Sequence, residues 1–469
     1  MRVESIVSIP GFSRPFRTNL APILFPLLSR ARPSKNGQRE KGQKKFKERR
    51  GEMERWLKSV LAVGLISGLV LMGSAGSSMA APDTVKIGAM FSQTGAGSAV
   101  GKIQVEAVNL AVKEVNDKGG VTMGGKKMKV EAVIRDDETK PDVAVRRLRE
   151  YQNDGINLLV AGTFAHVSQA LNEQVKGGQT YVMVPNGIQE KTFEKNEKAP
   201  YFSSTLGGVD AIGRICGDYV AKTYKPKSVV LFLPDYAYGH GAAKGANKIF
   251  KEKYPHIKIS EVWSPVGTPD FTSYIIKIKE AKPDAVMMGH WGNDAINALK
   301  QVYELGLRKE SKIFYNSIGY TLASGVPADA LDGVTMGWWW YHDLSGLKDP
   351  ATENAVNEFA KKYLKEFGDI PDTFAMYTYI AMMETLRGVQ TSNSTDPAKV
   401  YKAIMDKPEF MGPKGPAKWR IDGRPEYKYA YFILDGKGSK ARKDKHDIAK
   451  IVEAYTGPEL CLSLKEMGY

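Results

Sequence analysis

Short apolar runs alternate with longer segments of helical periodicity from residue 83 to about residue 434. Runs of about four to eight apolar residues are typical of buried strands, and longer amphipathic segments are typical of helices. A first series contains predicted strands at residues 85–91, 128–134, 158–161 and 181–184, with helices at 100–116, 141–154 and 168–176. Such alternation is typical of βα units on a largely parallel sheet. It therefore predicts one complete α/β lobe.

A second series of alternating strands and helices begins after Phe202 and has the same pattern as the first. It predicts strands at residues 229–233, 257–262, 285–288, 312–315 and 333–340, with helices at 211–223, 241–253, 271–280 and 294–305. The remaining pieces are three helices, at 352–367, 373–390 and 397–406, and a strand pair near 418–421 and 427–434. These pieces lack a sheet of their own, so we expect the chain to return to the first lobe and then to cross once more. The predicted fold class is α/β, with two Rossmann-like lobes of largely parallel sheets joined by several hinge strands.

Domain boundaries follow from this reading of the late segments. The expected limits are residues 83–204 plus 335–424 for the first lobe, 205–334 plus 425–440 for the second lobe, and 441–469 for a charged, loosely attached C-terminal tail.

The segment before the lobes has the three parts of a secretory signal peptide. Residues 53–80 begin with basic residues, continue through the apolar run 60–72 and end in Ser78-Met79-Ala80, which places small residues at a cleavage site after Ala80. The apolar part is shorter than the ~20 residues that a membrane span needs. We expect a cleaved signal and a periplasmic protein, with a membrane anchor as the alternative. Residues 1–52 are predicted to be a disordered basic extension, either a non-native addition before a true start at Met53 or a genuine basic arm.

The basic charge of the chain is concentrated in this leading part. The 469 residues carry a net charge of +15, but residues 1–80 hold 15 Lys/Arg and 5 Asp/Glu, which leaves +5 for the rest. A mildly basic folded part predicts no nucleic-acid partner. The two cysteines are too few for a disulfide scaffold. We expect Cys216 to be a buried free thiol, and a bridge to Cys461 is the alternative.

The short sequence motifs that could indicate catalysis or cofactor binding are incomplete in this chain. The glycines of residues 95–101 follow a strand and open a helix, but the third glycine comes one residue late for a dinucleotide fingerprint. Residues 120–127 match the start of a phosphate-binding loop, yet Lys127 stands where a hydroxyl must reach magnesium. The histidines include no pair within one helical turn, and no G-x-S-x-G elbow occurs. We therefore predict no catalytic residue, metal or cofactor, and an active site assembled from distant residues is the alternative.

Polar and aromatic residues follow the carboxyl ends of several predicted strands, where open α/β sheets bind ligands. These segments are residues 162–168, 185–188, 235–239, 290–293 and 316–320. The first runs into a helix whose exposed N–H groups can hold an anion or a carboxylate. The aromatic run at residues 338–341 lies where the chain crosses between lobes, so we expect it to pack against the hinge.

From residue 85 to about residue 434 the chain resembles the leucine/isoleucine/valine-binding family of periplasmic solute-binding proteins, which serve ABC importers and have the type I two-lobe fold. The resemblance rests on Lys86-Ile-Gly with Thr94, Gly95 and Gly101, on Val115-Asn-Asp-Lys-Gly-Gly-Val121, on Arg135-Asp-Asp137, on Asp235-Tyr-Ala-Tyr-Gly239, and on Met411-Gly-Pro413 leading into Trp419-Arg-Ile-Asp-Gly423. It implies a receptor that closes around a small solute.

The resemblance also implies which residues contact the solute. The implied ligand-binding residues are Val100, Phe164, Ala165, His166, Asn186, Ile188, Tyr236, Tyr238, Trp291 and Ser317. Two of them depart from the family pattern: Ile188 replaces a threonine, and Ser317 stands near the place of an acidic partner. A buried ammonium group without a carboxylate is costly. The expected solute is thus a branched-chain or hydrophobic amino acid or a related small solute, with an amide or an aromatic or short-chain acid as the alternative.

Two functions are consistent with this reading. The first is a transport receptor, not an enzyme, that acts as a monomer and hands its solute to a membrane permease with ATPase subunits. The second is a periplasmic sensor that binds a similar solute and reports to a receptor.

Overall fold

The computed structural model describes residues 84–207, 209–457 and 462–469, without the side chains of residues 209 and 210. The predicted basic extension and signal peptide lie outside the described residues, as does Cys461. Cys216 is a buried free thiol, as expected, and its Sγ donates to the carbonyl oxygen of Asn316 at 3.4 Å.

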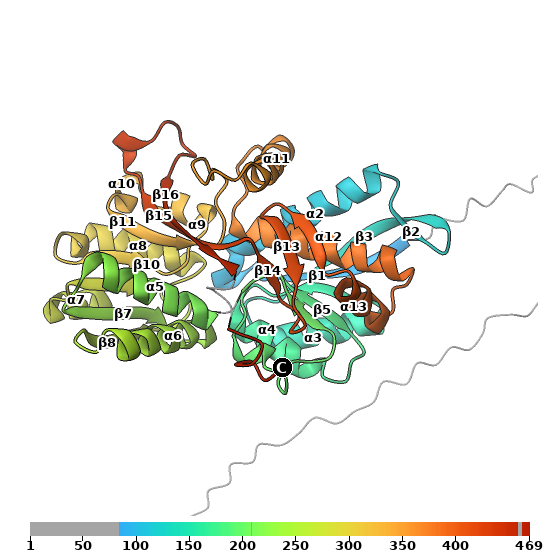
Figure 1. The fold of residues 1–469 in the computed structure, drawn as a ribbon, viewed down its shortest axis with the longest axis horizontal. Coiled ribbons are helices and arrows are strands. Elements are labelled where there is room, and N and C mark those ends of the chain that lie inside the picture. The colour runs from blue at the N-terminus through green and yellow to red at the C-terminus, as the bar shows by residue number, and fades with distance from the viewer. Residues whose placement is uncertain (1–83, 208, 458–461) are drawn as a thin grey trace, which may run out of the picture. The chain divides into compact units, whose positions relative to one another are not determined.

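The first lobe is built on a six-stranded sheet (Figure 1). Its strands, in the order β2-β3-β1-β4-β5-β6, are β2 (Val121–Met123), β3 (Lys126–Asp136), β1 (Thr84–Phe91), β4 (Leu158–Ala161), β5 (Tyr181–Val184) and β6 (Phe202–Ser204). All neighbours pair in parallel except the β2–β3 hairpin. Every residue of β4 and β5 is buried, because helices cover both faces of the sheet.

Helices from two distant parts of the chain cover this sheet. They are α2 (Ser98–Asp117), α3 (Pro141–Asn153) and α4 (Ala165–Gln174) from the first series, and α11 (Pro350–Phe367), α12 (Thr373–Ser392) and α13 (Pro397–Asp406) from the later part. The later helices pack on α2, β4 and β5, which places them in the first lobe. Helix α12 is buried along most of its length. The expected return of the chain to the first lobe is therefore what the structure shows.

The second lobe is built on a seven-stranded sheet. Its order is β16 (Ala449–Thr456), β15 (Tyr429–Gly436), β11 (Val334–Trp338), β10 (Lys312–Tyr315), β9 (Ala285–Met288), β7 (Ser228–Pro234) and β8 (Lys258–Ser264). Strands β11 to β8 pair in parallel, whereas β15 and β16 run antiparallel. The helices are α5 (Val209–Tyr224), α6 (Ala237–Lys253), α7 (Thr272–Ala281), α8 (Asn293–Glu304), α9 (Tyr320–Ser324) and α10 (Ala328–Leu331). Two lobes of mixed α/β structure with mostly parallel sheets confirm the predicted fold class.

Smaller elements complete the described chain. A three-stranded antiparallel sheet contains β12 (Glu409–Gly412), β13 (Gly415–Trp419) and β14 (Pro425–Tyr427). The short 3₁₀ helices are η1 (Gly95–Gly97), η2 (Lys191–Phe193), η3 (Leu307–Lys309) and η4 (Ser439–Ala441). The chain crosses between the lobes after β6, after β11 and between β14 and β15.

Two expected boundaries differ from the structure. Residues 335–338 belong to β11 of the second lobe, because Ile313 to Tyr315 pair in parallel with Val334 to Met336. The last crossing falls at Lys428, because β14 still pairs with β13. At the first place the buried strand β11 runs directly into the aromatic residues of the crossing, and at the second β14 and β15 are separated by Lys428 alone, so the local sequence does not mark the change of sheet.

The C-terminal part is also better attached than expected. Residues 441–469 contain β16, which forms an edge strand of the second sheet. Ile448, which directly precedes β16, is fully buried. The last residues lie on the first lobe, where Met467 is 1% exposed and its carbonyl oxygen accepts a bond from Lys195 N at 3.0 Å. An edge strand needs only one apolar face, and its other positions can carry charged residues. Such a strand does not form a continuous apolar run, so the sequence pattern did not predict it.

Candidate functional site

The carboxyl ends of strands from both lobes meet at a narrow cavity of about 10 Å³. Its lining residues are Thr163, Gly187, Leu206, Ile212, Tyr236, Tyr238, Trp291 and Trp339. They come from the segments after β4, β5, β6, β7, β9 and β11, together with helix α5. Small-molecule sites commonly measure roughly 300–1,000 Å³, so in this closed arrangement the lining side chains fill most of the space and a solute needs the lobes to move apart.

The first-lobe wall is formed by two loops packed tightly on each other. Gly187 has φ of +69°, and a Cβ there would lie 2.6 Å from the carbonyl oxygen of Thr163, so only glycine fits. The Thr163 hydroxyl donates to Gln104 Oε1 at 2.6 Å and accepts from Ser92 N at 3.1 Å. This wall is therefore held rigidly from behind.

Helix α4 begins next to this wall and directs its amino end to the other lobe. Phe164 precedes the helix and no side chain caps it. The ring of Tyr236, at the start of α6, lies 5.8 Å from the ring of Phe164 and 5.4 Å from that of His166. The first N–H groups of a helix lack internal acceptors and attract anions. The α4 amino end can thus contribute to the binding of a carboxylate.

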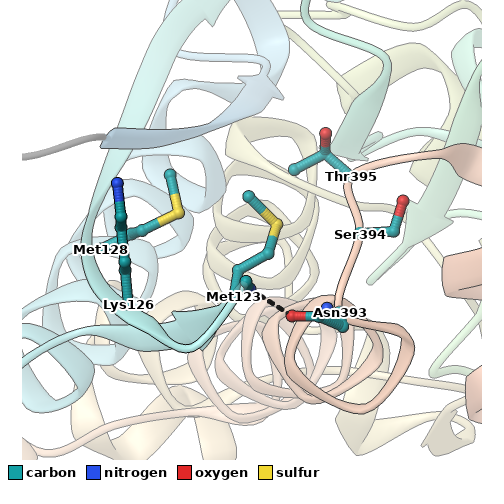
Figure 2. Close-up of a pocket in the computed structure, with 7 residues that line it drawn as sticks. Met123, Lys126, Met128, Asn393, Ser394 and Thr395 are labelled. Carbon is teal, nitrogen blue, oxygen red and sulfur yellow. Dashed lines mark hydrogen bonds between the residues drawn. The ribbon is translucent and has the colours of Figure 1, made fainter.

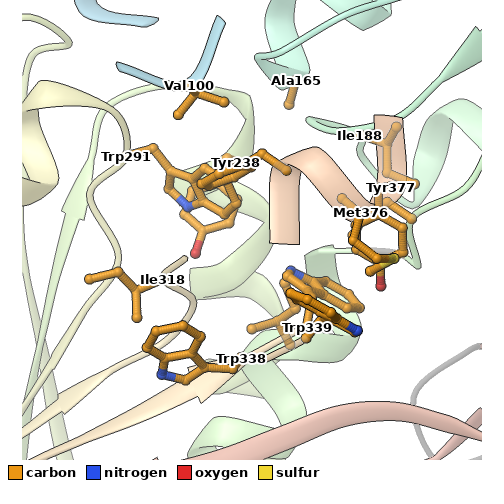
Figure 3. Packing of buried hydrophobic residues seen from close by; sticks show 14 of the residues in the cluster. Val100, Ala165, Ile188, Tyr238, Trp291, Ile318, Trp338, Trp339, Met376 and Tyr377 are labelled. Atoms are coloured by element: carbon orange, nitrogen blue, oxygen red, sulfur yellow. The ribbon is translucent and has the colours of Figure 1, made fainter. Parts of the chain in front are cut away.

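The second-lobe wall consists of aromatic side chains, of which Tyr238 and Trp291 are shown in Figure 3. Tyr238 and Trp291 pack edge to face with ring centroids 5.3 Å apart, and Tyr236 stacks on Tyr238 at 6.0 Å. The Tyr238 hydroxyl and the indole nitrogens of Trp291 and Trp339 are buried. Trp291 interacts with the Tyr238 hydroxyl, but none of the three groups has a hydrogen bond of regular geometry among the described residues. Burial raises the pKa of the Tyr238 phenol, so it stays protonated. The cavity therefore presents buried N–H and O–H groups to whatever it holds.

Contacts across the cavity show that the lobes are closed. Gln189 Nε2 donates to the carbonyl oxygen of Ala237 at 2.8 Å, and Asn293 Nδ2 donates to Ser98 Oγ at 3.3 Å. The rings of Trp291 and Phe374 lie 5.0 Å apart. Each contact joins one lobe to the other.

The structure places the ten predicted site residues at different depths. Tyr236, Tyr238 and Trp291 line the cavity. Phe164, Ala165 and His166 lie beside it at the start of α4, and Val100, Asn186, Ile188 and Ser317 are buried but do not line it.

Several of these residues have buried polar atoms without a hydrogen-bond partner among the described residues, and Asn186 and His166 are two of them. Both amide atoms of Asn186 are unpaired although the residue is 0% exposed. His166 donates from Nε2 to the carbonyl oxygen of Thr139 at 3.1 Å, which leaves Nδ1 unpaired. Burial lowers the pKa of His166, so the ring is neutral near pH 7. Unpaired buried groups of this kind are common where a ligand is bound.

Sequence reasoning missed five lining residues: Thr163, Gly187, Leu206, Ile212 and Trp339. Thr163 and Gly187 lie in two of the strand-end segments that the sequence predicts to bind a ligand, although neither position is among the predicted site residues. Leu206 and Ile212 lie next to the first crossing and look like ordinary core residues in the sequence. Trp339 begins the second crossing, where packing against the hinge was expected, and it also lines the cavity.

Asp294, an acid at the start of α8, is bound by a loop of its own lobe. Its Oδ2 accepts the backbone N–H of Gly267 at 2.7 Å, and burial raises its pKa to about 6. The carboxyl group thus ties the loop before α7 to the start of α8. It is not among the residues that line the cavity.

Asp137 supports the first-lobe wall and makes folding stability depend on pH. Burial raises its pKa to about 6, while Oδ1 accepts from Ser92 Oγ at 2.6 Å and Oδ2 has no partner. A raised carboxyl pKa stabilises the fold below pH ~4, and this stability is lost as the pH rises through about 6. In the wild-type protein Asp137 should lower the unfolding free energy by up to about 3 kcal/mol between pH 4 and pH 7. Asp137→Asn should remove this decrease, and urea denaturation at the two pH values measures it.

Asp136 provides the control for this prediction. Burial raises its pKa, but bonds from Thr94, Glu138 and Gln93 together outweigh burial and hold the pKa below its usual range. Asp136→Asn should therefore remove stability that is present above pH ~4. Identical pH profiles for the two variants would contradict the assignment.

A separate hollow lies at the opposite end of the first lobe (Figure 2). It is lined by Met123, Gly124, Lys126, Met128, Asn393, Ser394 and Thr395. Asn393 Oδ1 accepts the backbone N–H of Gly124 and joins the β2–β3 hairpin to the end of α12. This hollow adjoins the amino ends of the strands and shares no residue with the cavity.

Metal and membrane features are not found in the described ranges. No group of three or more His, Cys, Asp or Glu side chains in residues 84–207, 209–457 and 462–469 is placed to hold a metal ion. Among the helices of the same residues, none combines the length and the apolar character needed to cross a bilayer.

Residues 84–439 match the family model of periplasmic binding proteins. The chain belongs to this family. Periplasmic binding proteins of ABC importers bind small solutes outside the cytoplasm and deliver them to a membrane permease.

Individual relatives agree with the family assignment. The chain is 24% identical to a leucine-, isoleucine-, valine-, threonine- and alanine-binding protein of Pseudomonas aeruginosa, over 72% of this chain and 87% of that protein. A periplasmic binding protein from Burkholderia mallei has a TM-score of 0.72 at 23% identity, covering 82% of this chain and 98% of its own. A solute-binding protein from Rhodopseudomonas palustris in complex with benzoate has a TM-score of 0.67 at 19% identity, covering 80% and 97%.

Proposed function

We propose that this chain is the solute receptor of an ABC importer and that its solute is a small carboxylic acid with an apolar or aromatic body. The solute is held in the cavity between the lobes, which close by bending at the three crossings. The protein is exported after removal of residues 53–80, acts as a monomer without catalysis, and passes its solute to a permease with ATPase subunits.

The observation that carries this proposal is the type of polar group in the cavity wall. An indole nitrogen can only donate, and the protonated Tyr238 phenol offers a further O–H group. Trp291 and Trp339 supply two such indoles, and the α4 amino end supplies backbone N–H groups nearby. The eight described lining residues include no Asp or Glu. Donors suit a carboxylate, whereas an ammonium group would find no carboxylate among these residues and would have only hydroxyl and backbone oxygens as acceptors.

The apolar lining agrees with a ligand that has an apolar body. Leu206, Ile212 and three aromatic residues besides Trp339 face the cavity. The Rhodopseudomonas palustris neighbour binds benzoate, an acid of this kind. The Pseudomonas aeruginosa relative is named for amino acids, so a branched-chain amino acid is the second candidate.

A ligand panel tests the proposal on the purified mature protein. We expect benzoate and 3-methylbutanoate to raise the melting temperature, because a ligand at a hundredfold its Kd stabilises the fold by about 2.7 kcal/mol. L-Leucine and benzamide should stabilise it less. Calorimetric titration then gives the affinities. Stabilisation by leucine alone would favour the amino-acid receptor, and no stabilisation by any of the four would contradict the proposed ligand class.

A further inference from the structure

Lys414 is a fully buried lysine in the turn between β12 and β13. Its Nζ donates to the carbonyl oxygen of Trp339, to the carbonyl oxygen of Ala430 at 2.8 Å and to the Tyr377 hydroxyl at 2.9 Å. An ammonium group has three N–H donors, so these oxygens match it in number.

Four aromatic rings surround the same ammonium group. Their centroids lie 5.1 Å from Nζ for Tyr377 and Tyr427, 5.7 Å for Phe432 and 5.8 Å for Trp339. Ring faces and carbonyl oxygens both attract a cation, which counters the tendency of burial to neutralise a lysine. The surroundings of Lys414 therefore favour its charged form.

Two of the three oxygen partners of Lys414 come from the parts that join the lobes, and the third, Tyr377, belongs to α12. Trp339 begins the second crossing, and Ala430 lies just after the third. The same hairpin also accepts the Trp340 indole N–H at the carbonyl oxygen of Pro413, at 2.9 Å, and the N–H of Lys428 at Pro416 O, at 3.2 Å. The β12–β13 turn thus fastens two crossings to each other, and Lys414 is its central contact.

Trp339 connects this cluster to the solute cavity. Its side chain lines the cavity, its carbonyl oxygen binds Lys414, and its ring packs edge to face on Tyr377 and Tyr431. Figure 3 shows Trp339 beside Tyr377, with Trp291 and Tyr238 on the other side of the cluster. The positive charge of Lys414 consequently lies 5.8 Å from the centroid of a ring that forms the cavity wall.

We propose that Lys414 is a positioning residue of the solute site, which fixes Trp339 as a cavity wall and provides a buried positive charge that selects an anionic solute. This inference rests on the proposed function. It identifies Lys414 as the residue that makes the site prefer an acid over a neutral molecule of the same shape.

The test compares benzoate with benzamide, which have similar shapes and different charges. Lys414→Met keeps the length of the side chain and removes the charge, so benzoate should bind about tenfold more weakly. That size is expected for unit charges roughly 10 Å apart at an effective dielectric constant of about 20. The affinity for benzamide should change much less. Lys414→Gln, which keeps donors for the carbonyl oxygens, should give the same loss of preference and serves if Lys414→Met does not fold.

Lys198 offers a matched control. It is another largely buried lysine, with Nζ bound to the carbonyl oxygen of Ala199 at 3.1 Å and to the Tyr401 hydroxyl at 3.3 Å, and it does not line the cavity. Lys198→Met should leave the ratio of benzoate to benzamide affinity unchanged.

The calorimetric titrations can support or overturn the role of Lys414. A selective loss of benzoate affinity in the Lys414 variants supports the inference. An equal loss for both probes, or none, overturns it, because a purely structural lysine would not distinguish charge. Failure of the wild-type protein to bind either probe would refute the proposed ligand class, and the selection of an anion would fall with it.

Discussion

Gly292→Ala should abolish tight binding while leaving both lobes folded. Gly292 precedes α8 in the second lobe with φ of +61°, and a Cβ there would lie 2.1 Å from the carbonyl oxygen of Ala96 in the first lobe. The closed arrangement leaves no room for that methyl group. Because the receptor gains affinity only when both lobes contact the solute, we expect the Kd to rise about a hundredfold or more. Calorimetry with the strongest solute of the panel measures the change.

The control is a glycine at positive φ that lies outside the contact between the lobes. Alanine is more strained at Gly292, where ψ is −140°, than at Gly306, where ψ is 16°, so denaturant unfolding of both variants measures the local cost. Gly306, also in the second lobe, has φ of +70°, but a Cβ there would meet only Lys309 Cδ at 3.9 Å. Gly306→Ala should cost some stability and leave the affinity unchanged. Small-angle scattering should show that the wild-type protein becomes more compact with saturating solute and that Gly292→Ala does not. Unchanged affinity in Gly292→Ala would mean that the solute is not held between closed lobes.

The predicted fold agrees with the structure wherever strands are buried on both faces. Strands such as β4 and β9 are continuous apolar runs, so their positions follow directly from the sequence. Strand β16 interrupts its apolar residues with Lys450 and Glu453 and is only partly buried, so it was not predicted from the apolar pattern. The change of lobe at Lys428 was also misplaced, since chain crossings depend on long-range pairing rather than on local composition.

The candidate site shows the same division between local and long-range information. Tyr236, Tyr238 and Trp291 follow strand ends, and this position identified them. Trp339 and Ile212 line the cavity only because the hinge folds back between the lobes. The role of Lys414 depends on oxygens from Trp339, Tyr377 and Ala430, which lie 75, 37 and 16 residues away in the chain. No spacing rule in the sequence connects these residues.

Arg424→Met should cause the largest loss of stability. Arg424 is 0% exposed, with Nη1 2.8 Å from Glu190 Oε1 and Nη2 2.8 Å from Asp422 Oδ2. Both carboxylates are buried as well, and removal of one partner from a buried ion network costs about 3–5 kcal/mol. Denaturant unfolding at pH 7 measures this loss. Arg147→Met, which removes a half-exposed pair with Glu150 at 3.0 Å, should cost about 1 kcal/mol or less.

A second substitution in Arg424→Met distinguishes an electrostatic loss from a packing loss. Without the guanidinium group, Glu190 and Asp422 are buried negative charges with less compensation, which is costly. Glu190→Gln in the Arg424→Met background should therefore recover part of the lost unfolding free energy. No recovery would show that Arg424 stabilises the fold by packing, with its ring neighbour Phe193 at 5.2 Å as the main contact. Because Glu190 closely follows Asn186 and Gly187, an electrostatic loss should also loosen the first-lobe wall and weaken solute binding in the variant.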